Sequence, residues 1–348
     1  MHIAFFVNDM DREYPRYTTT ALAHEAVLRG HDVSYITPGD FVISPDDGLK
    51  AHARFVPKKK VKNYEEFFKG VQKAAEETEM IDLSEIDVLM LRSDPAQDAQ
   101  SVPWAEDVGI LFGREAAARG VLVLNDPDSL ALAINKIYFE SFPREVRADT
   151  LITRFRSDVK EFAKKHDGKL VLKPLQGSGG QSVFLVGGED SSNLNQMIEA
   201  ITRDGYLIAQ EYVPAAKEGD IRLFMMNGRP LEVNGKYAAL RRVSAEDDIR
   251  SNVHAGGKAV KTDISDRELR VAELIRPKLV ADGMFLVGID IVGDKILEVN
   301  VFSPGNLLSC SEMAEENFSV AVLESIERKL EIAEQFPGAL PNKVLATM

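Results

Sequence analysis

A glycine-rich loop between two strand-like runs, LVLKPLQGSGGQSVFLV at 170–186, restricts the possible folds of this chain more than any other feature. A Walker A loop places its lysine after the last glycine, whereas Lys173 precedes Gly177. A dinucleotide-binding loop leads from a strand into a helix, whereas this loop leads into a second strand. The segment therefore predicts an antiparallel hairpin. Its glycines, Gly177, Gly179 and Gly180, either let backbone N–H groups approach a phosphate, with Lys173 adding a charge, or form a plain flexible turn.

The first 126 residues have the pattern of an open α/β domain. Apolar periodicity predicts strands at 2–7, 31–38, 86–95 and 120–126. It predicts one early helix at 19–30, ending at Gly30. This β-α-β order is typical of a parallel sheet with crossover helices. The turn after the first strand, 8–18, contains no glycine, so a dinucleotide fingerprint is absent from it.

The remaining residues alternate between strands and helices in a different order. The predicted helices lie at 193–202, 266–283 and 317–330, and the predicted strands and hairpins at 206–214, 220–233 and 285–301. Asn227-Gly228 is a strong tight-turn signal within the first of these hairpins. The tail 334–348 is expected to be loosely packed.

Composition excludes several functional classes. A net charge of −13 argues against a general nucleic-acid binder. No apolar run approaches the roughly 20 residues that a membrane-spanning helix needs, and the N-terminus lacks the basic segment of a signal peptide. The single cysteine, Cys310, cannot form an internal disulfide, which fits a reducing cytoplasm best.

Three possible metal ligands lie in the hairpin at 285–301. Glu298 and Asn300 are two residues apart on one strand and share a face, while Asp290 lies on the preceding strand. A two-residue turn would place Asp290 opposite Leu297, on the wrong face, and a three-residue turn would place it opposite Glu298. The second register would gather three oxygen ligands of the kind that Mg²⁺ takes beside phosphates. The alternative is a solvated strand face without a metal.

Several motifs together resemble the ATP-grasp superfamily and, within it, the bacterial glutathione synthetase family. They are LRSDP at 91–95, NDPDSL at 125–130 with NK at 135–136, LVLKPLQGSGG, AQEYVPAAKEGDIRLFMMNG, RSNVHAGG at 250–257, LVGIDIVGD and LEVNVFSP. The resemblance implies an α/β protein, α+β in its C-terminal part, with an N-terminal α/β domain at 1–126, a lid domain at 127–209 and a core domain at 210–348. ATP would bind between the last two.

The family's reaction implies the chemistry. ATP phosphorylates a substrate carboxylate, and an amine attacks the acyl phosphate to give an amide, ADP and phosphate. For glutathione synthetase the acid is γ-glutamylcysteine and the amine is glycine. The implied cofactors are ATP and two Mg²⁺ ions, or Mn²⁺. The implied partners are small-molecule substrates and, by resemblance alone, further copies of the chain in a homo-oligomer.

The resemblance also implies a role for each matching residue. For the nucleotide these are Lys136 and Lys173 at the phosphates, Gly177, Ser178, Gly179 and Gly180 closing over them, Gln210, Glu211, Tyr212 and Val213 on the adenine side, and Asp220 near the ribose. Asp290, Glu298 and Asn300 would hold the metal. Arg242 and Arg222 would act in catalysis, and Arg222, Arg250, Asn252, Ser303 and Gly305 would face the acid substrate.

The chain departs from the family pattern at three places. The loop reads QGSGG where the family has DGMGG, Ser93 stands where a lysine is common, and VFSPGN replaces VTSPT. The last two changes lie near the family's acid-binding site. Two alternatives therefore stay open: a related ligase that joins a different acid and amine, and a protein that binds ATP without turnover.

Overall fold

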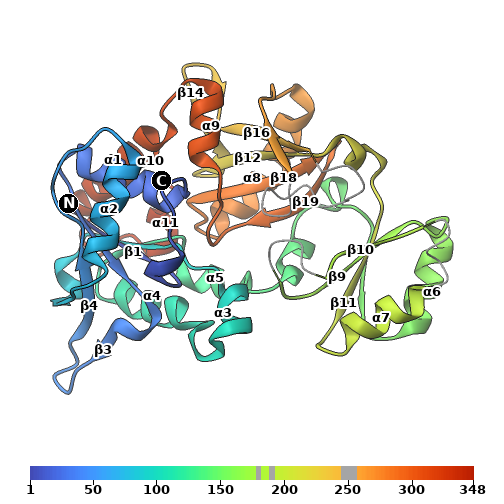
Figure 1. The fold of residues 1–348 in the computed structure, drawn as a ribbon, viewed down its shortest axis with the longest axis horizontal. Helices are drawn as coiled ribbons and strands as arrows, with labels where there is room; N and C mark the ends of the chain where they lie inside the picture. The colour runs from blue at the N-terminus through green and yellow to red at the C-terminus, as the bar shows by residue number, and fades with distance from the viewer. Residues whose placement is uncertain (178–181, 188–192, 244–256) are drawn as a thin grey trace.

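Three β-sheets form the framework of the protein (Figure 1). The computed structural model describes residues 1–177, 182–187, 193–243 and 257–348. Within these residues the sheets contain seven, four and six strands, with an additional two-stranded ribbon. In Figure 1 the N-terminal sheet lies on the left, the four-stranded sheet on the right, and the C-terminal sheet between and above them.

The N-terminal sheet confirms the predicted open α/β arrangement. The order of its strands is β3-β4-β2-β1-β6-β7, and β5 pairs with β4. The strands that pair in parallel are β1, β2, β6 and β7. These four strands are almost fully buried, as expected of a sheet covered on both faces. The strands are β1 His2–Phe6, β2 Asp32–Ile36, β3 Phe41–Ile43, β4 Leu49–Phe55, β5 Glu79–Asp82, β6 Val88–Leu91 and β7 Leu122–Leu124. The helices are α1 Thr18–Leu28, α2 Tyr64–Ala74, α3 Pro95–Ser101, α4 Val108–Ala118 and α5 Pro127–Leu132.

Two local features of this region bear on the sequence analysis. Gly30 has a φ of +90° directly after α1, which confirms the predicted helix stop. The antiparallel strands β3, β4 and β5 were not predicted, because their alternating polar residues give no continuous apolar run.

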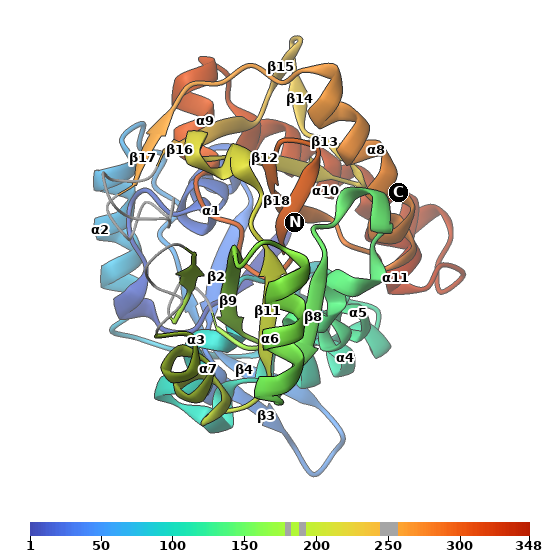
Figure 2. The ribbon, with the colours of Figure 1, turned by 90° about the vertical axis from the view of Figure 1, so that its right-hand side faces the viewer.

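The four-stranded sheet, which we call the lid sheet, has the order β10-β9-β11-β8. Its elements are β8 Thr150–Thr153, α6 Arg156–Lys165, β9 Leu170–Pro174, β10 Phe184–Val186, α7 Leu194–Thr202 and β11 Leu207–Glu211. Phe184 pairs with Leu172 and Val186 with Leu170, so the strands around the glycine loop form the predicted antiparallel hairpin. The predicted boundary at 209/210 falls within β11. Figure 2 shows α6 and α7 in front of this sheet.

The C-terminal sheet is antiparallel, with the order β17-β16-β12-β18-β19 and β13 on β12. Its strands and the ribbon are β12 Asp220–Met226, β13 Arg229–Pro230, β14 Glu232–Val233, β15 Lys236–Tyr237, β16 Ala239–Val243, β17 Lys258–Val260, β18 Leu286–Val292 and β19 Lys295–Asn300. The helices are α8 Asp266–Ala281, α9 Leu307–Ala314, α10 Phe318–Gln335 and α11 Asn342–Leu345. Asn227 and Gly228 both have positive φ between β12 and β13, which confirms the predicted tight turn.

The hydrophobic cores join the N-terminal and C-terminal sheets but not the lid sheet. Phe5 of β1 shares a core with Phe318 of α10, and Phe6 shares another with Ile289 of β18. The lid sheet has a separate small core around Val159, Leu172 and Ile198. Among the described residues, none of the helices combines the length and the apolar character that membrane crossing demands.

The expectation of a loosely packed tail is wrong for residues 342–346, whereas residues 334–339 are exposed. Asn342 accepts a hydrogen bond from the backbone of Val123 (2.8 Å) and donates to Asp126 (3.0 Å), which fastens α11 to the end of β7. Leu345 and Ala346 are buried beside it. This part of the tail packs because Asn342, the first residue of α11, satisfies backbone groups of Val123 while Leu345 and Ala346 enter the core.

Candidate active site

The hairpin of β18 and β19 brings the three predicted metal ligands together by a route that the sequence analysis did not predict. Val292 pairs with Lys295, so the turn has two residues and the expected three-residue turn is wrong. A β-bulge between Asp290 and Ile291 then shifts the register, and Asp290 lies opposite Glu298 as the metal hypothesis required. Leu297 is the extra residue of the bulge. The bulge allows a tight turn and the correct facing of both carboxylates in one hairpin.

Four charged residues meet on one face of the C-terminal sheet. Asp220 and Arg222 are two apart on β12 and share a face, and they pair with Arg242 of β16 and Asp290 of β18 respectively. Their exposed fractions are 3, 5, 6 and 2% in the order Asp220, Arg222, Arg242, Asp290. We call these four residues the charge cluster. Strand pairing alone therefore assembles it from three distant parts of the chain.

Ion pairs connect every member of the charge cluster. Arg222 binds Asp290 through Nε and, at 3.0 Å, through Nη2. Arg242 Nη2 lies 2.6 Å from Asp290 Oδ2 and 2.6 Å from Asp220 Oδ2. Burial opposes the charged form of Asp290, but the charges of Arg222 and Arg242 hold its pKa below the ordinary value. Two cations and two anions thus balance one another in a buried site.

The other two predicted ligands border this cluster. Asn300 Nδ2 lies 3.4 Å from Asp290 Oδ2, and Glu298 is half-buried opposite Asp290. Two carboxylates and an amide oxygen on facing strands are hard ligands that suit Mg²⁺ or Mn²⁺. The donor set therefore fits a divalent cation, although Asp290 is also the acceptor for both arginines.

Two lysines of the predicted nucleotide site lie where the lid sheet faces Glu298. Lys173 Nζ donates to Gln210 Oε1 (3.1 Å), and Lys136 Nζ donates to the carbonyl of Gly177 (2.5 Å). Burial lowers the pKa of Lys173 to about 8, and the charge of Glu298 opposes that fall. Within the described part of the chain neither lysine forms an ion pair. The site therefore offers positive charge beside the glycine loop.

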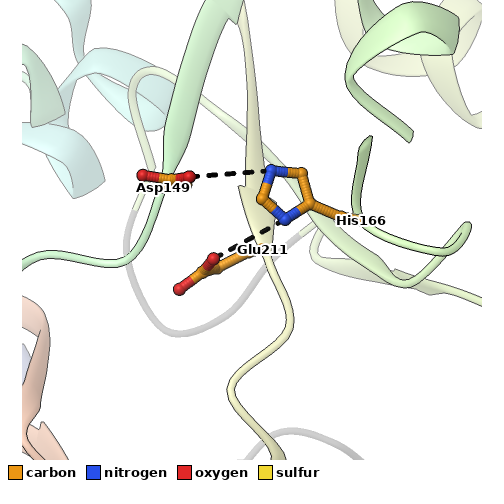
Figure 3. A group of neighbouring side chains, drawn as sticks. All are labelled: Asp149, His166 and Glu211. Carbon is orange, nitrogen blue, oxygen red and sulfur yellow. Dashed lines mark ion pairs between the residues drawn. The ribbon is translucent and has the colours of Figure 1, made fainter. Parts of the chain in front are cut away.

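Strand alternation separates two of the predicted adenine-side residues. The side chain of Gln210 joins Lys173 and, at 3.2 Å, Thr150, whereas the side chain of Glu211 points to His166 on the opposite face of β11 (Figure 3). Tyr212 donates its backbone N–H to the carbonyl of Lys169, and Val213 follows it at the start of a short 3₁₀ turn.

His166 lies between two carboxylates at the edge of the lid sheet. Its Nδ1 is 3.6 Å from Glu211 and its Nε2 is 3.9 Å from Asp149 (Figure 3). Although the three residues are close enough to suggest a metal site, the carboxylates approach opposite ring nitrogens. One ligand atom from each residue lies within 4.8 Å of the others, and the group joins Asp149 before β8, His166 after α6 and Glu211 of β11.

The predicted acid-binding residues are only partly described. Gly305 accepts a hydrogen bond from Arg222 Nη1 (3.3 Å), and Ser303 lies two residues earlier in the same irregular segment. Ser178, Gly179, Gly180, Arg250 and Asn252 lie outside the described residues, so their assignments stay predictions.

Two features of the site were missed in the sequence analysis. Asp220, expected near a ribose, is an ion-pair partner of Arg242. Arg92 is buried, and its Nη2 donates to the carbonyl of Pro304 (3.1 Å), which connects the N-terminal sheet to the segment that carries Gly305. The motif LRSDP was a signal for Arg92, but nothing in it indicates a contact with Pro304.

Comparisons with known proteins agree on one family. Residues 1–131 match the model of the N-terminal domain of prokaryotic glutathione synthetase, and residues 135–315 match that of its ATP-grasp domain. The glutathione synthetase of Escherichia coli (strain K12) is 32% identical over 317 residues, covering 89% of this chain and 92% of that protein. The glutathione synthetase of Gloeobacter violaceus is 33% identical over 314 residues, covering 87% of this chain and 90% of that protein.

Solved structures share the fold at low identity. D-cycloserine synthetase DcsG superposes with a TM-score of 0.62 and 16% identity, covering 93% of this chain and 99% of that one. The D-alanine–D-alanine ligase of Bacillus anthracis, solved with ATP, superposes with a TM-score of 0.53 and 13% identity, covering 97 and 100%. These likenesses establish the ATP-grasp fold.

Proposed function

The chain belongs to the prokaryotic glutathione synthetase family and is an ATP-grasp ligase that forms carbon–nitrogen bonds, and we propose that it joins γ-glutamylcysteine to glycine at the charge cluster. The observation that carries this proposal is the arrangement of Asp290 opposite Glu298, with Arg222 and Arg242 both bound to Asp290. An ATP-dependent ligase has to neutralise phosphate charge on both sides of the transferred group, and the two arginines and the candidate metal ligands of this site support that role.

The proposed reaction has two steps. An oxygen of the acid's carboxylate attacks the γ-phosphorus of ATP, the bond to ADP breaks, and an acyl phosphate forms. The neutral amine nitrogen then attacks the acyl carbon, the carbon–oxygen bond to phosphate breaks, and the proton that the nitrogen loses ends on the released phosphate. Amide, ADP and phosphate are the products. Both steps need positioning and charge neutralisation more than covalent help from the protein.

The residues of the site divide this work. Lys136 and Lys173 hold the phosphates of ATP beside the glycine loop, where their ammonium groups have no described carboxylate partner. Arg242 neutralises the transferred phosphoryl group, and Arg222 orients the acid. Asp290, Glu298 and Asn300 would hold two Mg²⁺ ions, or Mn²⁺, which would neutralise phosphate charge when bound.

The remaining assignments follow from family membership. The predicted nucleotide residues are Gly177, Ser178, Gly179, Gly180, Gln210, Glu211, Tyr212, Val213 and Asp220, and the predicted acid-binding residues are Arg222, Arg250, Asn252, Ser303 and Gly305. We also propose the domain limits 1–126, 127–209 and 210–348. We propose a cytoplasmic location as well and, by resemblance to the family alone, a homo-oligomer.

A second candidate is a related ligase with another acid and amine. It is favoured by Ser93 and by the VFSPGN segment, because these departures lie where the N-terminal sheet meets Gly305. An ADP-release screen of acids crossed with amines separates the candidates. Release with γ-glutamylcysteine plus glycine supports glutathione synthesis, whereas release with another pair only would replace it. No ADP release with any pair would favour a protein that binds ATP without turnover.

A further inference from the structure

Glu13 is a buried acidic residue of the N-terminal domain, and among the described residues one of its two carboxylate oxygens has no hydrogen-bond partner. It follows the 3₁₀ turn Met10–Arg12 that leaves β1, and it is only 9% exposed. Its Oε2 is fully enclosed and has no hydrogen-bond partner, and no ion pair of Glu13 occurs within the described residues. Burial raises its pKa to about 7, and the charge of Arg92 opposes that rise. An unpaired buried carboxylate is costly for folding, so its presence requires an explanation.

Its place in the sheet suggests the explanation. β1 pairs with β2 on one side and with β6 on the other, so the direction of strand succession reverses at β1. In open parallel sheets, ligands bind outside the carboxyl ends of the strands at such a reversal. Glu13 follows the carboxyl end of β1, and Arg92 follows the carboxyl end of β6.

Arg92 connects this position to the active site. It donates to Thr19 (3.3 Å) and to the carbonyl of Pro304 (3.1 Å), and the next residue, Gly305, accepts from Arg222 (3.3 Å). The segment 303–306, which carries both carbonyls, belongs to no helix or strand. Arg92 therefore contacts Pro304, and the neighbouring residue, Gly305, contacts Arg222 of the charge cluster.

The carboxylate of Glu13 and the guanidinium of Arg92 form no ion pair in the described residues, but their charges influence each other's pKa, and they match the two charges of an amino-acid head group. The proposed acid has its reacting carboxylate at one end and a zwitterionic head, with an ammonium and a carboxylate, at the other. If the reacting end lies at Arg222, the head has to lie at a distance from it. The Glu13–Arg92 position supplies both complementary charges there.

We propose that Glu13 is a specificity-determining residue that receives the ammonium group of the acid substrate, while Arg92 faces the carboxylate of the same head group. This inference rests on the proposed function, since it assigns the head of the acid that the charge cluster activates. It explains the unpaired carboxylate, because the substrate supplies the missing partner. It also defines the substrate class: acids with a free amino-acid head remote from the reacting carboxylate.

The test compares γ-glutamylcysteine with glutarylcysteine, which differs from it only by lacking the amino group. In the unchanged protein we expect kcat/KM to favour the amino-bearing acid. Glu13→Gln should lower that preference about 10- to 100-fold, mainly through the KM for the acid, because a charged hydrogen bond to the ammonium is lost. Glu13→Asp keeps the charge and should restore part of the preference. Asp11→Asn, an exposed change in the same loop, is the matched control.

The outcomes separate this proposal from the proposed function. If γ-glutamylcysteine and glycine release no ADP in the unchanged protein, the proposed substrate fails, and the same comparison is made with the accepted acid and its analogue without the amino group. An accepted acid that has no ammonium group would overturn the role of Glu13. So would an unchanged preference in a folded Glu13→Gln variant, with folding checked by thermal unfolding.

Discussion

Lys173 in the lid sheet is partly buried and Arg222 in the C-terminal sheet is buried, but of these two cations only Arg222 forms an ion pair with a described residue. Arg222 and Arg242 share Asp290, and Asp220 completes the balance. Lys173 and Lys136 hydrogen-bond only to neutral oxygens among the described residues. An anion can therefore bind the lid lysines without displacing any described carboxylate, whereas a ligand of the charge cluster competes with ion pairs that already exist.

The largest expected effect is on stability, from breaking the charge cluster. Asp290→Asn removes the carboxylate that pairs with Arg222 and one of the carboxylates that pair with Arg242. We expect the free energy of unfolding to fall by about 3–5 kcal/mol. Urea denaturation measures the change. Asp294→Asn, in the exposed turn of the same hairpin, is the control and should shift the unfolding free energy by less than about 0.5 kcal/mol. A loss under about 1 kcal/mol for Asp290→Asn would mean that the cluster is not a balanced unit.

The next effect is on turnover, at the residue that faces both regions. Glu298 is half-buried and forms no ion pair among the described residues, so Glu298→Gln should change stability little. If Glu298 is a metal ligand, ADP release should fall about 100- to 1000-fold, because charge stabilisation of the transferred phosphoryl group is lost. Steady-state ADP release with Asp294→Asn as control tests this. Unchanged turnover would remove the metal assignment.

A smaller effect is expected in the lid sheet. Lys173→Met removes a desolvated cation without leaving a charged partner unpaired, so the free energy of unfolding should stay the same or rise slightly. The affinity for ADP should fall about 10- to 100-fold, since a charge-assisted contact to phosphate is lost. Calorimetric titration with ADP gives both affinities, with Lys164→Met on the exposed face of α6 as control. Destabilisation as large as that of Asp290→Asn would contradict the comparison between the two regions.

The smallest expected effect is the uptake of protons when ADP binds. The pKa of Lys173 is about 8 because of burial, so near pH 8 roughly half of its side chains are neutral. A bound phosphate favours the ammonium form and raises this pKa, so ADP binding at pH 8 should take up about half a proton, and its affinity should fall as the pH rises above 8. At pH 6 no uptake from this residue is expected. Titrations in buffers of different ionisation enthalpy measure the uptake, and Lys173→Met should abolish it.

Sequence reasoning succeeded where one local pattern decides the structure. The absence of a helix after the glycine loop was enough to predict the hairpin of β9 and β10, and Asn227-Gly228 was enough to predict the tight turn between β12 and β13. The parallel strands of the first sheet followed from continuous apolar runs. In each case the deciding residues lie within one element or its turn.

Sequence reasoning failed where the pairing of distant segments or a local irregularity determines the position of a side chain. The bulge that places Asp290 opposite Glu298 has no signature, because its extra residue, Leu297, is an ordinary strand residue. The partners of Arg222 and Arg242 depend on the pairing of three strands. The family resemblance supplied the list of site residues, but it did not indicate that two of them, Asp220 and Arg242, bind each other.

The separate core of the lid sheet has a consequence for hydrogen exchange. Since the cluster around Val159, Leu172 and Ile198 shares no residue with the cores that join the other two sheets, the lid sheet can open as its own cooperative unit. Its amides should exchange at a lower opening free energy than those of β1 or β18. A nucleotide held by Lys173 would slow exchange in β9 and β11 while leaving β1 and β18 nearly unchanged, so the protection pattern itself would report which sheet the ligand orders.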